Sequence, residues 1–213
     1  MSLVITIDVE YPERPGREPL AVFDDLLAVI DRHQVPVTFL VQGRWALAYP
    51  SQTAALLQRG HSVGLHGHAH VDYRRLSSAG VAAELQDGVA ALRGAVPGHE
   101  VRWCRLPYGH GASDPDIAAR LREAGLVPLG WDRSGFDWDA SLSDEAALQR
   151  LLPAVDEGGV VLFHSWPART PRLLDSLLSS GGAAQVTALD DVELRGSSPR
   201  GRTLHIEPRD LPR

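Results

Sequence analysis

Short apolar segments alternate with amphipathic segments along most of the chain, and this alternation limits the fold more than any other feature. We expect strands at 3–8, 36–42, 61–66, 100–105, 126–131, 159–164 and 185–189. We expect helices between them at 20–33, 44–59, 77–95, 114–125, 143–157 and 170–180. Strands and helices that alternate in this way form parallel β/α units. The pattern predicts a small or incomplete β/α barrel, with a doubly wound open sheet as the competing architecture.

The length of 213 residues suits one domain with a core of its own. We expect this domain to span 1–190 and the Arg- and Pro-rich segment 191–213 to be a peripheral tail. The formal net charge of −6 argues against a nucleic-acid partner, which requires a basic surface.

Several residue types are absent or rare, and their absence excludes whole classes of chemistry. The sequence has no lysine and no asparagine, so Schiff-base lysines, the P-loop lysine and lysine-bridged metal pairs are ruled out. Its one cysteine, Cys104, permits neither an internal disulfide nor a multi-cysteine zinc site, and its apolar surroundings indicate a buried structural thiol.

The sequence predicts a cytoplasmic protein without a membrane span. No basic segment followed by an apolar run opens the chain, and no apolar run is long enough to cross a bilayer. The sequence does not define an oligomeric state.

Clusters of polar residues follow five of the expected strands at their carboxyl ends. The clusters are Asp8 with Glu10, His66 to His70, Arg105 to Gly109, Asp132 to Trp138, and His164. In a parallel β/α fold these ends lie on one face, which is the face where such enzymes build their active sites. We therefore expect the five clusters to converge on one site.

The chemistry of these residues points to a metal-dependent hydrolase. His66 and His70 are four residues apart, so on one helical turn both imidazoles would point the same way and could share a cation. Two histidines and one carboxylate are a common set of ligands for a hydrolytic metal. Asp8 and Glu10 supply two carboxylates, of which one would bind the metal and the other would take a proton from water. His164, at a strand end, could protonate a leaving group.

In this order, the segments "TIDVE", "HGHAH", "RLPYG", "WDRSGFDW" and "VVLFHS" resemble the five motifs of the NodB-homology polysaccharide deacetylases, carbohydrate esterase family 4. The resemblance runs from residue 3 to about residue 166. It implies a single domain with a distorted (β/α)7-type barrel. One difference is Val9, which separates two acidic residues that are usually adjacent in the family, so the resemblance alone does not fix the roles of Asp8 and Glu10.

The resemblance also assigns roles to individual residues. It implies that Asp8 is the general base, that His164 is the general acid, and that Arg105 and Asp137 hold these two groups. The implied metal ligands are Glu10, His66 and His70, which leaves His68 as a bystander. The residues expected to bind substrate are Pro107, Tyr108 (through its backbone N–H), Trp131, Trp138 and Leu162.

The implied reaction is the metal-dependent removal of an N-acetyl or O-acetyl group from a carbohydrate or amino-sugar substrate. Zinc is the expected metal, with cobalt, nickel or manganese as alternatives. Two other functions stay open, namely hydrolysis of a small non-carbohydrate amide or a cyclic ureide or imide, and carbohydrate binding without catalysis. The "GHSVG" segment at 60–64 matches a serine-hydrolase motif, but it precedes a strand instead of following one, so we read Ser62 as a strand residue.

Overall fold

A computed structural model describes residues 2–11 and 19–194, and its centre is one seven-stranded sheet. The strands lie in the order β5-β4-β3-β2-β1-β7-β6, and the pairings between them are all parallel. Their bounds are β1 Leu3–Val9, β2 Thr38–Val41, β3 Ser62–Leu65, β4 Trp103–Cys104, β5 Val127–Pro128, β6 Arg133–Ser134 and β7 Gly159–His164. The first strand, β1, is therefore an interior strand of the sheet, between β2 and β7.

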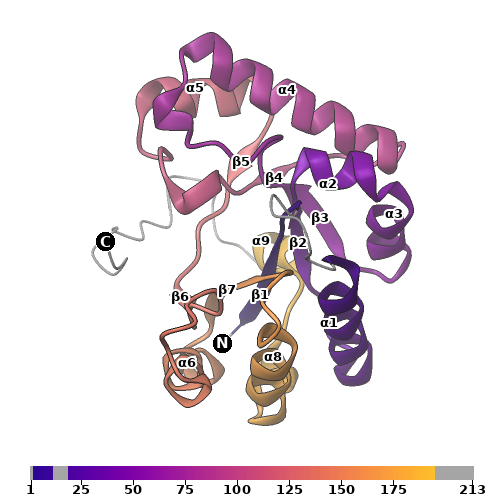
Figure 1. The fold of residues 1–213 in the computed structure, drawn as a ribbon, viewed down its shortest axis with the longest axis vertical. Helices are drawn as coiled ribbons and strands as arrows, with labels where there is room; N and C mark the ends of the chain where they lie inside the picture. Colours follow the sequence, from indigo (N-terminus) through magenta and orange to yellow (C-terminus); the bar gives the residue numbers. More distant parts are fainter. Residues whose placement is uncertain (1, 12–18, 195–213) are drawn as a thin grey trace.

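The sheet curls into a partly closed barrel, and most of the helices surround its outer face (Figure 1). The α-helices are α1 Pro19–His33, α2 Gly43–Ala48, α3 Pro50–Gln58, α4 Ser78–Ala95, α5 Pro115–Glu123, α6 Asp144–Leu151, α7 Pro153–Glu157, α8 Thr170–Ser179 and α9 Leu189–Leu194. Short 3₁₀ helices lie at Tyr73–Arg75, Pro107–Gly109 and Gly182–Gln185. The prediction of a distorted (β/α)7-type barrel in a single domain is confirmed.

Successive side chains of each strand point to opposite faces of the sheet, which divides the core in two. All seven residues of β1 are buried. Its odd-numbered members Leu3, Ile5 and Ile7 pack with the surrounding helices, while the even-numbered members face the interior of the barrel. The interior cluster consists of Val4, Leu40, Trp103, Leu129, Val160 and Leu189. Polar residues of the same even-numbered face lie beyond this cluster, at the carboxyl ends of the strands.

The opposite end of the barrel is closed by α9. Asp190 on this helix accepts hydrogen bonds from Trp103 Nε1 at 2.8 Å and from Ser62 Oγ at 2.9 Å. Leu189 contributes to the interior cluster. The helix therefore seals the amino-terminal ends of the strands, and only the other end remains for a site.

Gly64 in β3 has no side chain, and residues of the interior cluster fill the space beside it. A Cβ atom on this residue would lie 2.7 Å from the Trp103 carbonyl oxygen and 2.8 Å from Leu40 Cδ1. We expect Gly64→Ala to lower the free energy of unfolding by about 1–3 kcal/mol, because an added methyl forces a packed core apart. Denaturant unfolding measures this loss, and Gly94→Ala is the control because nothing lies within 4 Å of its added Cβ. Equal stability of the two variants would contradict the packing argument.

Proline residues account for two of the differences between the predicted and observed elements. The helix predicted at 44–59 is divided at Pro50, and the helix predicted at 143–157 is divided at Pro153. Each proline starts a new helix, since a proline has no N–H to continue the preceding one. The predicted strand at 185–189 is wrong, because this segment follows a 3₁₀ helix and forms only a bridge between Leu3 and Val186.

Other predictions concern single features of the chain. Cys104 is buried, which confirms the structural thiol, and burial raises its pKa to about 12. Within the described residues, no helix combines the length and the apolar character needed to cross a bilayer. Helix α9 runs past the expected domain boundary at residue 190, and residues 195–213 of the expected tail lie outside the described residues.

Candidate active site and metal centre

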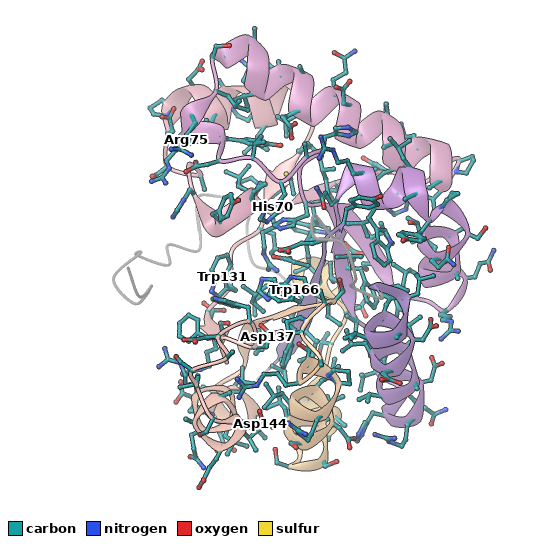
Figure 2. The ribbon with its side chains drawn as sticks, viewed as in Figure 1. His70, Arg75, Trp131, Asp137, Asp144 and Trp166 are labelled. Atoms are coloured by element: carbon teal, nitrogen blue, oxygen red, sulfur yellow. The ribbon has the colours of Figure 1, made fainter. Side chains whose placement is uncertain are left out.

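The carboxyl ends of the strands bring the predicted polar clusters together. Asp8 in β1 is the register partner of His164, the last residue of β7. Glu10 lies one residue past the end of β1. His66 follows directly after β3, and Arg105 follows directly after β4. Figure 2 shows His70, Trp131, Asp137 and Trp166 toward the middle of the molecule, with Arg75 and Asp144 at its periphery. The predicted convergence on one site is borne out by these positions.

Glu10, His66 and His70 form a compact group of three potential metal ligands. One ligand atom from each lies within 4.8 Å of the other two. Glu10 Oε1 is 3.3 Å from His70 Nε2 and 3.7 Å from His66 Nε2, and the two imidazole centroids are 5.0 Å apart. Two imidazole nitrogens and one carboxylate oxygen suit zinc and similar divalent ions, with coordination positions left for water and substrate.

The tautomer of His66 supports this assignment. Its Nδ1 donates to the Arg105 carbonyl oxygen at 2.9 Å, so in the neutral imidazole the lone pair is on Nε2. That Nε2 atom is buried and has no hydrogen-bond partner among the described residues. A buried polar atom without a partner is costly, and a bound cation would satisfy it. The donor set therefore fits a divalent metal ion.

The loop that carries the histidines is not a helical turn, contrary to our expectation. Strand β3 ends at Leu65, and the chain turns at Gly67 and His70, which have φ values of 66° and 53°. The Glu84 carboxylate in α4 accepts hydrogen bonds from the backbone N–H groups of His68 at 3.0 Å and Ala69 at 3.1 Å. The loop geometry and this carboxylate, which sequence reasoning missed, bring His70 beside His66.

His68 points away from the other two histidines. A Cβ added to Gly43 in α2 would lie 2.5 Å from His68 Nδ1, so this imidazole packs against the start of that helix. His68 is outside the group of potential ligands. Its position agrees with the predicted role of a bystander.

Arg105 holds Asp8 in the barrel interior. Its Nη1 donates to Asp8 Oδ1 at 2.8 Å and to Thr6 Oγ1 at 2.9 Å, while Nε and Nη2 donate to the Leu129 and Gly130 carbonyl oxygens. Both members of the ion pair are almost completely buried. The second oxygen of the carboxylate, Oδ2, lies 3.6 Å from His66 Nε2 and so faces the ligand group. The arginine thus holds one oxygen of the carboxylate and leaves the other directed at the site.

Asp137 fixes the orientation of His164. One carboxylate oxygen, Oδ1, lies 2.9 Å from His164 Nδ1, and the other accepts from the His164 backbone N–H at 2.8 Å and from Thr170 Oγ1 at 2.7 Å. Burial alone would lower the pKa of His164, but the charge and hydrogen bond of Asp137 raise it to about 9. His164 Nε2 points toward Glu10 Oε1, 3.9 Å away. A protonated imidazole therefore faces the ligand group from the side of β7.

Neighbouring charges shift the pKa values of two members of the ligand group, Glu10 and His66. Burial alone would raise the pKa of Glu10, but the neighbouring imidazoles of His66, His70 and His164 hold it well below its ordinary value. Burial alone would lower the pKa of His66, but the charges of Asp8 and Glu10 raise it. The Glu10 carboxylate is therefore held in its charged form, which attracts a cation.

The residues expected to bind substrate surround this group. Trp138 stands edge-on to His164 with centroids 4.8 Å apart, and Leu162 is buried two residues before that histidine. Tyr108 is 54% exposed, and the centroid of its ring lies 4.6 Å from that of the His70 ring. Pro107 packs against Gly67, and the Trp131 ring lies against Gly109. Each of the five therefore lies beside a residue of the site or of its loops, and Trp131 also packs against the interior cluster.

Three site loops contain unusual backbone. Among the described residues, non-glycine φ values are positive at Gln34, His70, Tyr108 and Phe136. The last three lie in the loops that carry the second histidine, the expected oxyanion donor and Asp137. Such conformations cost energy and concentrate at functional sites.

Comparison with known proteins places these features in context. The model of the polysaccharide deacetylase family matches residues 2–129. A chitooligosaccharide deacetylase from Bradyrhizobium sp. (strain ANU 289) is 32% identical over 140 residues, which cover 66% of this chain and 63% of that protein. The matched region thus spans less than two thirds of this relative's length.

Solved structures show the same fold at lower sequence identity. A family 4 carbohydrate esterase from Streptomyces lividans superposes with a TM-score of 0.74 at 23% identity, over 88% of this chain and 91% of that chain. A family 4 pseudoenzyme from Bacillus anthracis superposes with a TM-score of 0.77 at 20% identity, over 89% and 64% of the two chains. Because the same fold includes a pseudoenzyme, the fold alone does not establish catalysis, and the argument for it depends on the site residues.

Proposed function

The chain belongs to the polysaccharide deacetylase family, and from this membership we propose that it is a metal-dependent hydrolase that removes the acetyl group from the nitrogen of an amino-sugar unit. The observation that carries the proposal is the position of two proton-transfer groups beside the three potential metal ligands. Asp8 Oδ2 lies 3.6 Å from His66 Nε2, and His164 Nε2 lies 3.9 Å from Glu10 Oε1. A hydrolase needs both groups, one to activate water and one to release the amine.

Glu10, His66 and His70 would hold the divalent cation, for which zinc is our first choice. When bound, the cation polarises the acetyl carbonyl and makes water easier to deprotonate. The residues of the chain perform the proton transfers around it.

Asp8 acts as the general base. Its Oδ2 faces the ligand group while Oδ1 is held by Arg105, so the carboxylate is oriented toward the attacking water. It accepts one proton of this water as the oxygen adds to the acetyl carbon. The Tyr108 backbone N–H is our candidate for donating to the oxyanion that forms, a role that preorganised amides perform well.

His164 acts as the general acid. An amide nitrogen is a poor leaving group until it is protonated, and His164 is held in its protonated form by Asp137. Transfer of the Nε2 proton to the nitrogen allows the carbon–nitrogen bond to break. The products are acetate and the free amine, and the proton that Asp8 accepted balances the one that His164 donates.

The walls of the site support a carbohydrate substrate. Tyr108, Trp131 and Trp138 are exposed or half-buried aromatic residues beside the ligand group. Faces of aromatic rings pack well against the C–H groups of a sugar ring. Buried Leu162 provides an apolar surface that suits an acetyl methyl group.

Acetate release from a panel of substrates tests this function. The panel contains N-acetylglucosamine oligomers, acetylated xylan, small N-acetyl amines and a cyclic ureide, whose ring opening is followed separately because it releases no acetate. We expect acetate from the N-acetylglucosamine oligomers in the presence of zinc or cobalt, loss of release after chelation, and recovery when metal is restored. Release from xylan alone would point to ester hydrolysis. Metal-loaded protein that turns over no member of the panel would contradict the proposed function and favour a binding role.

A further inference from the structure

Trp166 is hydrogen-bonded to one of the potential metal ligands. Its Nε1–H donates to Glu10 Oε2 at 2.7 Å, across 156 positions of the sequence. Trp166 lies two residues after His164, on the segment that leaves β7, and β7 is the strand beside the one that Glu10 follows. Figure 2 shows Trp166 in the middle of the molecule. The indole therefore reaches the site from a strand that carries none of the three potential ligands.

The two oxygens of Glu10 have different surroundings. Oε1 faces the imidazoles, at 3.3 Å from His70 Nε2 and 3.7 Å from His66 Nε2, whereas Oε2 accepts the indole hydrogen bond. An indole nitrogen donates only, so it neither binds a cation nor competes with the histidines for one. Its hydrogen bond occupies the carboxylate oxygen that faces away from the histidines.

We propose that Trp166 is a positioning residue that presents Glu10 to the metal through the single oxygen Oε1. The proposal rests on the proposed function, since it concerns the same metal site. Glu10 lies beyond the end of β1, and a glutamate side chain has several rotatable bonds to fix. Hydrogen bonds to the outer oxygen of a ligating carboxylate orient it, and their loss typically weakens metal binding by about 10–100-fold.

The competing role for Trp166 is a sugar-stacking surface, which predicts a different result. Trp166→Phe keeps an aromatic ring and removes the N–H, so it separates the two roles. We expect the Kd for zinc to rise about 10–100-fold. The KM for substrate at saturating zinc is expected to change by less than about twofold. An unchanged Kd for zinc together with a raised KM would overturn the proposal in favour of stacking.

Competition of the apoprotein with a chromophoric chelator for zinc measures the Kd without any turnover. Trp103→Phe is the matched control, because Trp103 Nε1 also donates to a carboxylate, that of Asp190, at the closed end of the barrel. We expect this control to bind zinc as the unchanged protein does. The visible absorption of the cobalt-loaded protein gives a second readout. We expect its intensity to change in Trp166→Phe, because a released Oε2 would alter the coordination geometry.

A second variant keeps the proposal testable if Trp166→Phe is unstable. Trp166→Gln retains an N–H donor without the ring, and we expect it to bind zinc more tightly than Trp166→Leu. Equal affinities of the Gln and Leu variants would overturn the proposal. The two proposals can fail separately. If the protein binds zinc, if Trp166→Phe lowers its affinity for zinc, and if no acetate is released, the proposed function is refuted while the role of Trp166 is supported.

Discussion

His70→Ala is expected to abolish metal binding and, with it, acetate release. His70 supplies one of the three potential ligands, and its Nε2 lies 3.3 Å from Glu10 Oε1. Structural zinc sites bind with about 10–16 kcal/mol, and on this scale one of three ligands carries about 3–5 kcal/mol, which corresponds to a loss of affinity on the order of 10²–10⁴-fold. Metal content after dialysis, together with acetate release, measures the effect.

His68→Ala is the matched control for this experiment. It removes the same side chain from the same loop, but His68 packs against α2 and lies outside the ligand group. We expect this variant to retain its metal. Loss of the metal in His68→Ala but not in His70→Ala would show that the wrong pair of histidines has been assigned.

The sequence predicted which residues lie together better than it predicted the bounds of the elements that carry them. Asp8, Glu10 and His164 could be placed because each follows or ends an apolar run long enough to be recognised as a strand. Parallel topology then requires such positions to share one end of the sheet. The same reasoning placed Arg105 and Asp137, although strand β6, which leads to Asp137, is only Arg133–Ser134 and was not predicted.

The errors have physical causes that local patterns do not reveal. The spacing of His66 and His70 suggested a helical turn, but the approach of the two rings depends on positive φ values and on Glu84, which lies in the following helix. The bond between Trp166 and Glu10 joins residues 156 positions apart. The one available signal was the alternation of side chains along a strand. Trp166 follows His164 by two residues and so continues the inward-facing side of β7. Contacts of this range depend on how the sheet closes, which no local window contains.

Asp137→Asn is expected to lower kcat by about 10²–10⁴-fold near neutral pH, because it removes the charge that keeps His164 protonated. In the native site Asp137 Oδ2 accepts hydrogen bonds from the His164 backbone N–H and from Thr170 Oγ1. The amide oxygen of an asparagine would take this place, so its NH₂ group would face His164 Nδ1 and disfavour a proton there. The imidazole would then be neutral and a weak acid.

The pH profile separates this loss of acid from a loss of fold. Asp137 raises the pKa of His164 to about 9, so the acid is present below that pH and disappears as the pH rises through it. A divalent cation beside Glu10 lowers this value, because like charges disfavour protonation. In Asp137→Asn we expect the basic limb of kcat/KM to move to lower pH, so that the deficit relative to the unchanged protein narrows as the pH falls toward about 6. Asp139→Asn is the control, since the hydrogen bonds of its carboxylate go to Ser141 and not to the site. A uniform loss of kcat/KM at every pH, with the basic limb in its original place, would mean that Asp137 stabilises the loop without tuning His164.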